Sequence, residues 1–178
     1  MLSFYFFYLF LIFIKKYVII YLSNEERIKK YMKIYLAGSC GIERRTEMQK
    51  IAKELRKFHT VYCPFELKIE NAWDMSQEEW AQKVFECDTM AIDSADCVVI
   101  ISPGRVSTAG TNWEQGYAYA KDKPVFVFQY TKEPASLMTY CGCTNFVNVT
   151  EADDIPYAIG LHINKNLTTK HPTATVLT

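Results

Sequence analysis

Two carboxylic acids are the side chains of this sequence best suited to bond-breaking chemistry. Glu114 could be an anionic nucleophile, and Asp88, inside a predicted helix where aspartate is a mediocre former, could be a second carboxyl group opposite it. Asp96 follows Asp88 by eight residues and directly precedes an apolar run, so it could equally end the preceding helix. Asp93 lies between them and is expected on the surface. Tyr35 is either a half-buried strand residue or a member of the same site.

Glu114 also has an ordinary structural explanation. Thr111 and Glu114 have the spacing of a capping box, in which Thr111 is the N-cap of a helix and Glu114 bonds back to it. The carboxylate would then lie in the first helical turn, where the positive end of the helix dipole keeps it ionised. The cap and the nucleophile use the same geometry, so neither interpretation excludes the other.

The segment AGSCGIERR (37–45) could hold an anion. Its glycines, Gly38 among them, allow close approach of a phosphate or a sugar. Ser39, Arg44 and Arg45 could bind that group through hydrogen bonds and charge. The segment is neither GxGxxG nor a P-loop, and a strand-to-helix turn followed by solvated arginines explains it at least as well.

Strands that alternate with helices must position these residues. Short apolar runs predict strands at 33–38, 60–64, 96–102, 123–130 and 145–149. Periodic segments predict helices at 46–58, 76–95, about 112–121 and 151–165, with a short helix or turn near 135–142. Ser76 and Glu79 have capping-box spacing at the second helix. This order predicts an α/β fold, a flavodoxin-like, doubly wound, five-stranded parallel sheet with helices on both faces.

Ligands of such sheets bind beyond the carboxyl ends of the strands, near the reversal of strand order. That rule selects the loops at 37–45, 102–111 and 130–137. Glu114 would face the ligand at this mouth of the sheet.

The composition argues against a polyanionic partner. Twenty basic and twenty acidic residues balance, so no strong field attracts a nucleic acid polymer or an anionic membrane, and a small partner fits better. The six cysteines are irregularly spaced and match no zinc pattern. We therefore expect a reduced, cytoplasmic protein without a metal site.

Residues 1–31 are expected to lie outside the fold. They form an apolar extension without the charge order of a signal peptide, and Met32 stands directly before the globular pattern. We expect the working domain to span 32–165 and a polar tail to occupy 166–178. The alternative is that residues 1–22 are a real membrane anchor.

Four segments in this order resemble the nucleoside 2-deoxyribosyltransferase family. KIYLAGS places Tyr35 at the family's strand tyrosine, and CDTMAIDSADCVVI places Asp88 and Asp96 in its Asp-x7-Asp motif. AGTNWEQGYAYA resembles its Gly-x-x-x-Glu-x-Gly-x-Ala signature, with Gly110 first and Glu114 as nucleophile. SLMTYCG resembles its Leu-Met loop, which reaches a neighbouring subunit's site.

The resemblance covers about residues 33–149 and implies cleavage of the N-glycosidic bond of a 2'-deoxynucleoside. Glu114 would form a deoxyribosyl-enzyme, Asp88 would help to protonate the leaving base, and Tyr35 would orient Glu114. A second base or water would release the sugar, without a metal or organic cofactor. The resemblance also implies a homo-oligomer in which Ser136 contributes to a shared site.

Two positions depart from the transferases. Thr108, beside Ser107, replaces an aspartate that holds the sugar's 5'-hydroxyl, and Ser136 replaces an asparagine before Leu-Met. Hydroxyls and amides can accept a 5'-phosphate that an aspartate would repel. These departures resemble the related 2'-deoxynucleoside 5'-phosphate N-hydrolases.

Three functions remain open on the sequence. The first is transfer of deoxyribose between bases. The second is hydrolysis of a 2'-deoxynucleoside 5'-monophosphate to free base and deoxyribose 5-phosphate, and the third is a non-catalytic nucleotide-binding module. The expected partners are a small-molecule deoxynucleoside or deoxynucleotide and a nucleobase.

Overall fold

A parallel sheet forms the centre of the described part of the chain. The computed structural model describes residues 31–38, 42–104 and 108–166. Five strands lie in the order β2-β1-β3-β4-β5, and every neighbouring pair is parallel. The strands are β1 (Lys33–Gly38), β2 (Thr60–Tyr62), β3 (Cys97–Ser102), β4 (Val125–Gln129) and β5 (Asn145–Asn148). This order confirms the predicted flavodoxin-like, doubly wound α/β fold.

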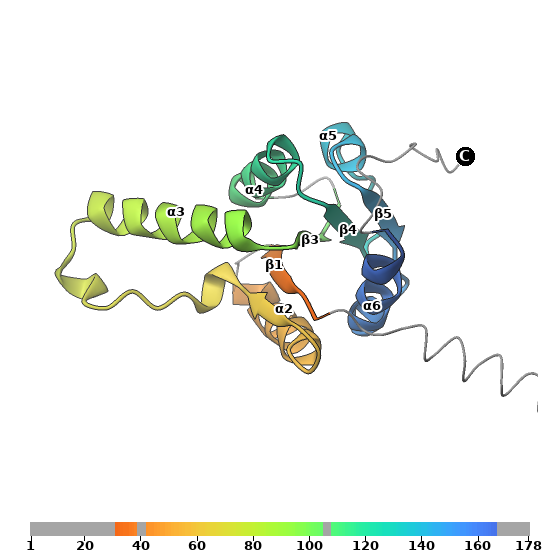
Figure 1. Ribbon diagram of the computed structural model, residues 1–178, viewed down its shortest axis with the longest axis horizontal. Helices are drawn as coiled ribbons and strands as arrows, with labels where there is room; N and C mark the ends of the chain where they lie inside the picture. Colours follow the sequence, from red (N-terminus) through yellow and green to blue (C-terminus); the bar gives the residue numbers. More distant parts are fainter. Residues whose placement is uncertain (1–30, 39–41, 105–107, 167–178) are drawn as a thin grey trace, which may run out of the picture. The chain divides into compact units, whose positions relative to one another are not determined.

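Helices cover both faces of the sheet (Figure 1). They are α2 (Ile42–Leu55), α3 (Gln77–Ser94), α4 (Ala109–Ala120), α5 (Leu137–Cys141) and α6 (Ile155–Asn166), with 3-10 turns at Pro64–Glu66, Ala72–Asp74 and Ala152–Asp154. α2 and α6 pack on one face, and α3 and α4 pack on the other. Within the described ranges, no helix combines the length and the apolar character needed to cross a bilayer. Residues 1–30 of the predicted N-terminal extension and all of the polar tail beyond residue 166 lie outside those ranges.

Alternation along the strands divides the core into two layers. Ile34 and Leu36 of β1 join the cluster under α2 and α6, whereas Tyr35 and Ala37 join the cluster under α3 and α4. Successive side chains of a strand point to opposite faces, so the apolar run of β1 fills both layers. Tyr35 therefore points toward α4, the helix that carries Glu114.

The capping box predicted for α3 is confirmed. The Ser76 hydroxyl accepts from the Glu79 backbone N–H at 3.2 Å, and the Ser76 backbone N–H donates to the Glu79 carboxylate at 2.8 Å. From this start α3 runs back to the sheet, where Ile92 is fully buried (Figure 1). Asp88 lies four residues before Ile92 and therefore on the same face of the helix, toward the sheet.

A glycine turns the loop after β3. Gly104 has a φ of 88°, in the left-handed region that favours glycine. A Cβ at this position would lie 2.6 Å from the Glu133 Cβ and 2.8 Å from the Glu133 carbonyl oxygen. The missing side chain thus lets the loop pass close to the segment after β4 on its way to α4.

Candidate active site

Two stacked tyrosines lie at the centre of the candidate site. Tyr35 of β1 and Tyr62 of β2 are partners in the parallel register, and their rings stack with centroids 5.4 Å apart and planes inclined by 18°. Paired residues of neighbouring strands point to the same face, which explains the contact. Tyr35 is fully buried and Tyr62 is half-buried. The stack fixes two hydroxyl groups on the face of the sheet that α3 and α4 cover.

Each tyrosine hydroxyl donates to one carboxylate. The Tyr35 hydroxyl donates to Glu114 Oε1 at 2.7 Å, and the Tyr62 hydroxyl donates to Asp88 Oδ1 at 2.8 Å. Within the described residues, the second oxygen of each carboxyl group has no hydrogen-bond partner. The structure thus brings together the three residues predicted to be catalytic, although their roles stay predictions.

The N-cap of α4 is Thr108 and not Thr111. The Thr108 hydroxyl accepts from the Thr111 backbone N–H at 3.2 Å, and the helix begins at Ala109. Glu114 consequently lies in the second turn, and its carboxylate bonds to Tyr35 instead of the helix start. The predicted Thr111–Glu114 capping box was wrong because Thr108 has the same capping chemistry and starts the helix earlier.

Burial raises the pKa of Glu114 to about 7. The hydrogen bond from Tyr35 lowers this pKa, and the Asp88 carboxylate raises it. The expectation that the helix dipole keeps Glu114 ionised was therefore wrong, because the dipole fades beyond the first turn while the loss of water dominates. A carboxyl group of this pKa is present in both forms near neutral pH, as a group with a catalytic task often is.

Asp88 and the two tyrosines are shifted by the same environment. Burial raises the pKa of Asp88, and the hydrogen bond from Tyr62 opposes that change. Burial and the neighbouring carboxylates raise the pKa of Tyr35 and of Tyr62, so both hydroxyls keep their protons and act as donors. The arrangement can supply an ionised carboxylate for attack and a second carboxyl group for proton transfer.

Of the serines and arginines predicted to bind an anion, the structure describes only the two arginines. Ser39 and Ser107 lie outside the described residues. Arg44 donates to the Tyr130 hydroxyl, and its guanidinium lies over the same ring, 5.5 Å from the centroid. Arg45 is exposed to solvent. The protein itself therefore holds Arg44 near the end of β4.

Two glycines predicted for this site have different surroundings. A Cβ on Gly38 would lie 2.8 Å from the Met48 Cε, so its small size serves the packing of α2 against β1. Within the part of the chain that the structure describes, nothing lies within 4 Å of the Cβ position of Gly110. The first turn of α4 contains no acidic residue. Gly110 thus leaves the backbone at the start of α4 open to a ligand.

Asp96 lies away from the carboxyl ends of the strands. It directly precedes β3, where its carboxylate accepts from the Lys33 backbone N–H at 2.8 Å. In a parallel sheet this edge is opposite the one at which ligands bind. The hydrogen bond to Lys33 indicates that Asp96 helps to align β1 and β3, and Asp96 lies apart from the candidate site.

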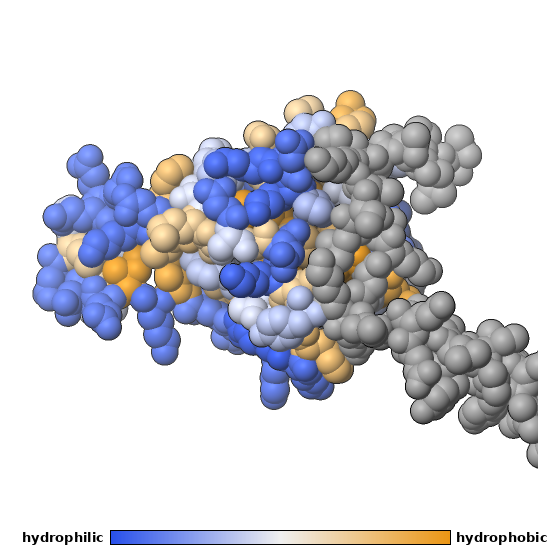
Figure 2. Space-filling model, in the orientation of Figure 1, coloured by the Kyte–Doolittle hydropathy of each residue, from blue (hydrophilic) through white to orange (hydrophobic). Residues whose placement is uncertain are grey.

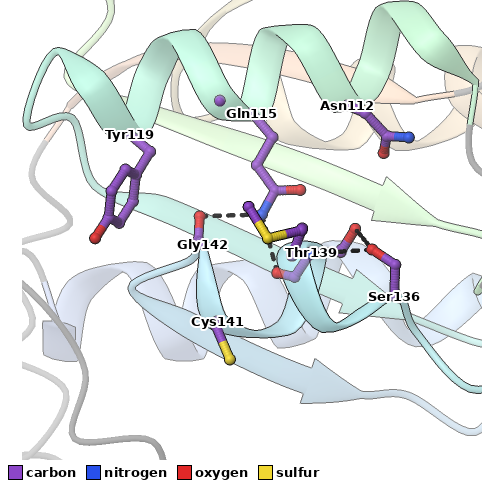
Figure 3. A pocket seen from close by; sticks show the side chains of 9 residues that line it. Asn112, Gln115, Tyr119, Ser136, Thr139, Cys141 and Gly142 are labelled. Carbon is purple, nitrogen blue, oxygen red and sulfur yellow. Dashed lines mark hydrogen bonds between the residues drawn. The ribbon is translucent and has the colours of Figure 1, made fainter.

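Ser136 lines a different hollow, a groove of about 510 Å³ between α4 and α5 (Figure 3). Its hydroxyl accepts from the Thr139 backbone N–H at 3.1 Å and so caps α5. Gln115 Nε2 donates to the carbonyl oxygens of Thr139 and Gly142, at 2.9 and 3.0 Å, and ties α5 to α4. None of the three residues predicted to be catalytic lines this groove.

The described residues contain no cluster of side chains that could hold a metal ion. No group of three or more His, Cys, Asp or Glu side chains gathers there as metal ligands would. Four of the described cysteines are free thiols, namely Cys87, Cys97, Cys141 and Cys143. The candidate site therefore consists of the two carboxyl groups and the tyrosines that donate to them.

The sequence analysis missed Tyr62 and Gln115. Tyr62 had a signal, because tyrosine is the third residue of both KIYLAG and TVYCP, and these segments become neighbouring strands. Gln115 had none, because its partners are backbone carbonyls 24 and 27 residues further along the chain.

A family model of the nucleoside 2-deoxyribosyltransferases matches residues 34–166. The chain belongs to the nucleoside 2-deoxyribosyltransferase family. The match includes Tyr35, Asp88 and Glu114 and extends beyond the stretch of the sequence resemblance. A search of curated proteins found no match.

Three solved structures share the fold of this deoxyribosyltransferase-family chain. A 2-deoxyribosyltransferase from Bacillus psychrosaccharolyticus is 28% identical, with a TM-score of 0.55 over 69% of this chain and 89% of its own. The CMP N-glycosidase of Clostridium botulinum is 20% identical, with a TM-score of 0.53 over 72% and 97%. A conserved protein from Enterococcus faecalis is 20% identical, with a TM-score of 0.50 over 74% and 98%. The last two show the shared fold alone, whereas the family makes this chain an N-glycosyl transferase or hydrolase.

Glu114→Gln is expected to stabilise the protein at about pH 8 and not at about pH 4. The folded-state pKa of Glu114 is about 7 against an ordinary 4.5, so folding penalises the ionised carboxylate, and the penalty disappears where both states are protonated. The substitution should add about 1–3 kcal/mol to the free energy of unfolding at the higher pH. Urea unfolding at both pH values measures the gain, with the exposed Glu151→Gln as control. Equal gains at both pH values would contradict the raised pKa.

Proposed function

We propose that this protein cleaves the N-glycosidic bond of 2'-deoxynucleosides through a covalent deoxyribosyl-Glu114 intermediate and passes the sugar to another base. The observation that supports it best is the pair of carboxyl groups, each held by its own tyrosine at 2.7 and 2.8 Å. Family membership and the 28%-identical 2-deoxyribosyltransferase add support. Two carboxyl groups in different environments match the division of labour in retaining glycoside cleavage.

In the first half-reaction, the ionised carboxylate of Glu114 attacks the anomeric carbon of the sugar. The bond from that carbon to the base nitrogen breaks, its electron pair passes to the base, and Asp88 supplies the proton that the base gains. The sugar lacks an electron-withdrawing 2'-hydroxyl, so positive charge at the anomeric carbon forms more easily. The products are free base and an ester between the sugar and Glu114.

In the second half-reaction, a nitrogen of another base attacks the same carbon. The ester oxygen leaves as the Glu114 carboxylate, and the proton lost by the incoming base returns to Asp88. Two displacements on opposite faces of the sugar give net retention of configuration.

One proton shared by the two carboxyl groups fits this division of labour. Burial raises the pKa of both carboxyl groups, so the pair can hold a single proton near neutral pH. A base bound beside Asp88 would exclude water and raise the pKa of Asp88. The proton would then lie on Asp88, the proton donor, and Glu114, the nucleophile, would be ionised. The singly protonated pair is therefore the active form.

A second candidate is hydrolysis of 2'-deoxynucleoside 5'-monophosphates to free base and deoxyribose 5-phosphate. The start of α4 favours it, because Thr108 is the N-cap, Gly110 exposes the backbone and the first turn carries no acidic residue that would repel a phosphate. Free backbone N–H groups at a helix N-terminus bind anions. Water would replace the second base as acceptor.

The proposed active form is a cytoplasmic homo-oligomer that assembles through α5. Leu137 and Met138 are each 82% exposed, and Figure 2 shows apolar surface over α5. Adjoining exposed apolar side chains of this size often mark an interface. A second copy packed there would bring Ser136 to a neighbouring site, as the resemblance of SLMTYCG to the Leu-Met loop implies. The free cysteines suit a reducing compartment.

Product analysis separates the two candidate reactions. With a 2'-deoxynucleoside and a second base, transfer predicts base exchange, because the ester on Glu114 is released by a nitrogen nucleophile. The corresponding 5'-monophosphates should stay intact. Free base with deoxyribose 5-phosphate from a monophosphate would favour the hydrolase, and no base release from either class would contradict both.

Glu114→Gln and Glu114→Ala are expected to lower kcat/KM by at least about 10³-fold, because neither side chain can form the ester under turnover conditions. Asp88→Asn should cost about 10²-fold with ordinary bases and less with a base that leaves without protonation. Steady-state assays measure both losses, and Glu151→Gln should match the unsubstituted protein. Full activity of Glu114→Ala would rule out the proposed nucleophile.

Leu137→Glu is expected to dissociate the oligomer, because a carboxylate buried at an apolar interface loses its hydration. Analytical ultracentrifugation should show a smaller species, with lower activity. Tyr157→Glu, at a residue 72% exposed on α6, serves as control and should leave the size unchanged. If the unsubstituted protein is already a monomer, the proposed assembly is refuted.

A further inference from the structure

Tyr62 has no role in the two half-reactions proposed above, yet it makes a hydrogen bond to Asp88. Its hydroxyl donates to Asp88 Oδ1 at 2.8 Å, and its ring stacks on Tyr35 with centroids 5.4 Å apart. We propose that Tyr62 is a positioning residue, which directs the proton of Asp88 onto Oδ2 and holds that atom toward the leaving base. This role rests on the function proposed above.

The direction of the hydrogen bond decides which oxygen can carry the proton. Burial and the neighbouring Asp88 raise the pKa of Tyr62, so its hydroxyl remains protonated and donates. Asp88 Oδ1 accepts that bond, so a proton on the carboxyl group is best placed on Oδ2. Oδ2 has no partner within the described residues and can therefore donate to a substrate.

The same geometry repeats at the nucleophile. Tyr35 donates to Glu114 Oε1 and leaves Oε2 for attack on the sugar. Because Tyr35 and Tyr62 are register partners with stacked rings, their hydroxyls stand side by side. The stack thus holds the attacking oxygen and the proton-donating oxygen in one fixed relation.

Acidic groups from four elements surround this pair of bonds. The titratable groups that influence one another here are Tyr35 of β1, Tyr62 of β2, Cys87 and Asp88 of α3, and Glu114 of α4. Among the described residues, no Lys, Arg or His contributes to these shifts. Each tyrosine bond therefore favours the ionised form of its own carboxyl group, and losing one changes chiefly that group.

The test compares the pH profiles of Tyr62→Phe and Tyr35→Phe. Both substitutions keep the ring and its stack and remove one hydroxyl. The Tyr62 bond lowers the pKa of Asp88, so Tyr62→Phe should move one limb of the kcat/KM profile upward by about one pH unit. The Tyr35 bond lowers the pKa of Glu114, so Tyr35→Phe should move the other limb of the profile upward. The pH profile of kcat/KM should therefore become narrower in one variant and wider in the other than in the unsubstituted protein.

The rate constants provide a second part of the test. Tyr62→Phe should lower kcat about 10-fold with little change in KM, because alignment in the transition state is lost and binding is retained. A uniform loss at all pH values, or an unchanged profile, would overturn the positioning role. Active Glu114→Gln would defeat the proposed function itself, whereas inactive Glu114→Gln with an unchanged Tyr62→Phe profile would overturn only the role of Tyr62.

A final readout needs no turnover. Carboxyl carbon NMR titration of Asp88 should give a higher pKa in Tyr62→Phe than in the unsubstituted protein, and an unchanged pKa would overturn the inference. Circular dichroism establishes that the variant is folded, and the retained aromatic stack makes folding the expected result.

Discussion

The register between β1 and β2 is the constraint on which the rest of the site depends. Tyr35 meets Tyr62 because Lys33 pairs with Thr60 and the following residues pair in turn. A slip of one residue would turn one ring to the opposite face of the sheet, into the layer under α2 and α6. Both carboxyl groups come from helices, but the strands decide where those groups are held. A strand of three residues, β2, thereby sets the geometry of the candidate site.

Among the described residues, the acidic groups of the candidate site gather without a cation, which destabilises the fold locally. A cationic partner would lower the pKa of Glu114 and remove its neutral form near pH 7. Tyrosine hydroxyls moderate the pKa of each carboxyl group without fixing its charge. The two apolar layers of the sheet supply the stability that offsets this cost. In the proposed reaction, this balance lets one proton move between the two carboxyl groups.

The sheet followed from the sequence, because apolar runs and helical periodicity are local signals. The meeting of Tyr35, Asp88 and Glu114 was implied by the resemblance of four ordered segments to the family. The start of α4 did not follow from the sequence, since Thr108 and Thr111 are equally good caps by residue type and the helix uses Thr108. The raised pKa of Glu114 could not be predicted either, because burial is set by the packing of three separate segments. Tyr62 escaped notice because its role depends on the register of the short strand β2.

Detection of the covalent intermediate tests the central claim most directly. Protein mixed with a 2'-deoxynucleoside without an acceptor base is quenched rapidly in acid and examined by mass spectrometry. We expect a mass gain of one deoxyribosyl group on the peptide that contains Glu114, which disappears when an acceptor base is added before the quench. Base release without any adduct, or an adduct on another residue, would contradict the assignment of Glu114 as the nucleophile.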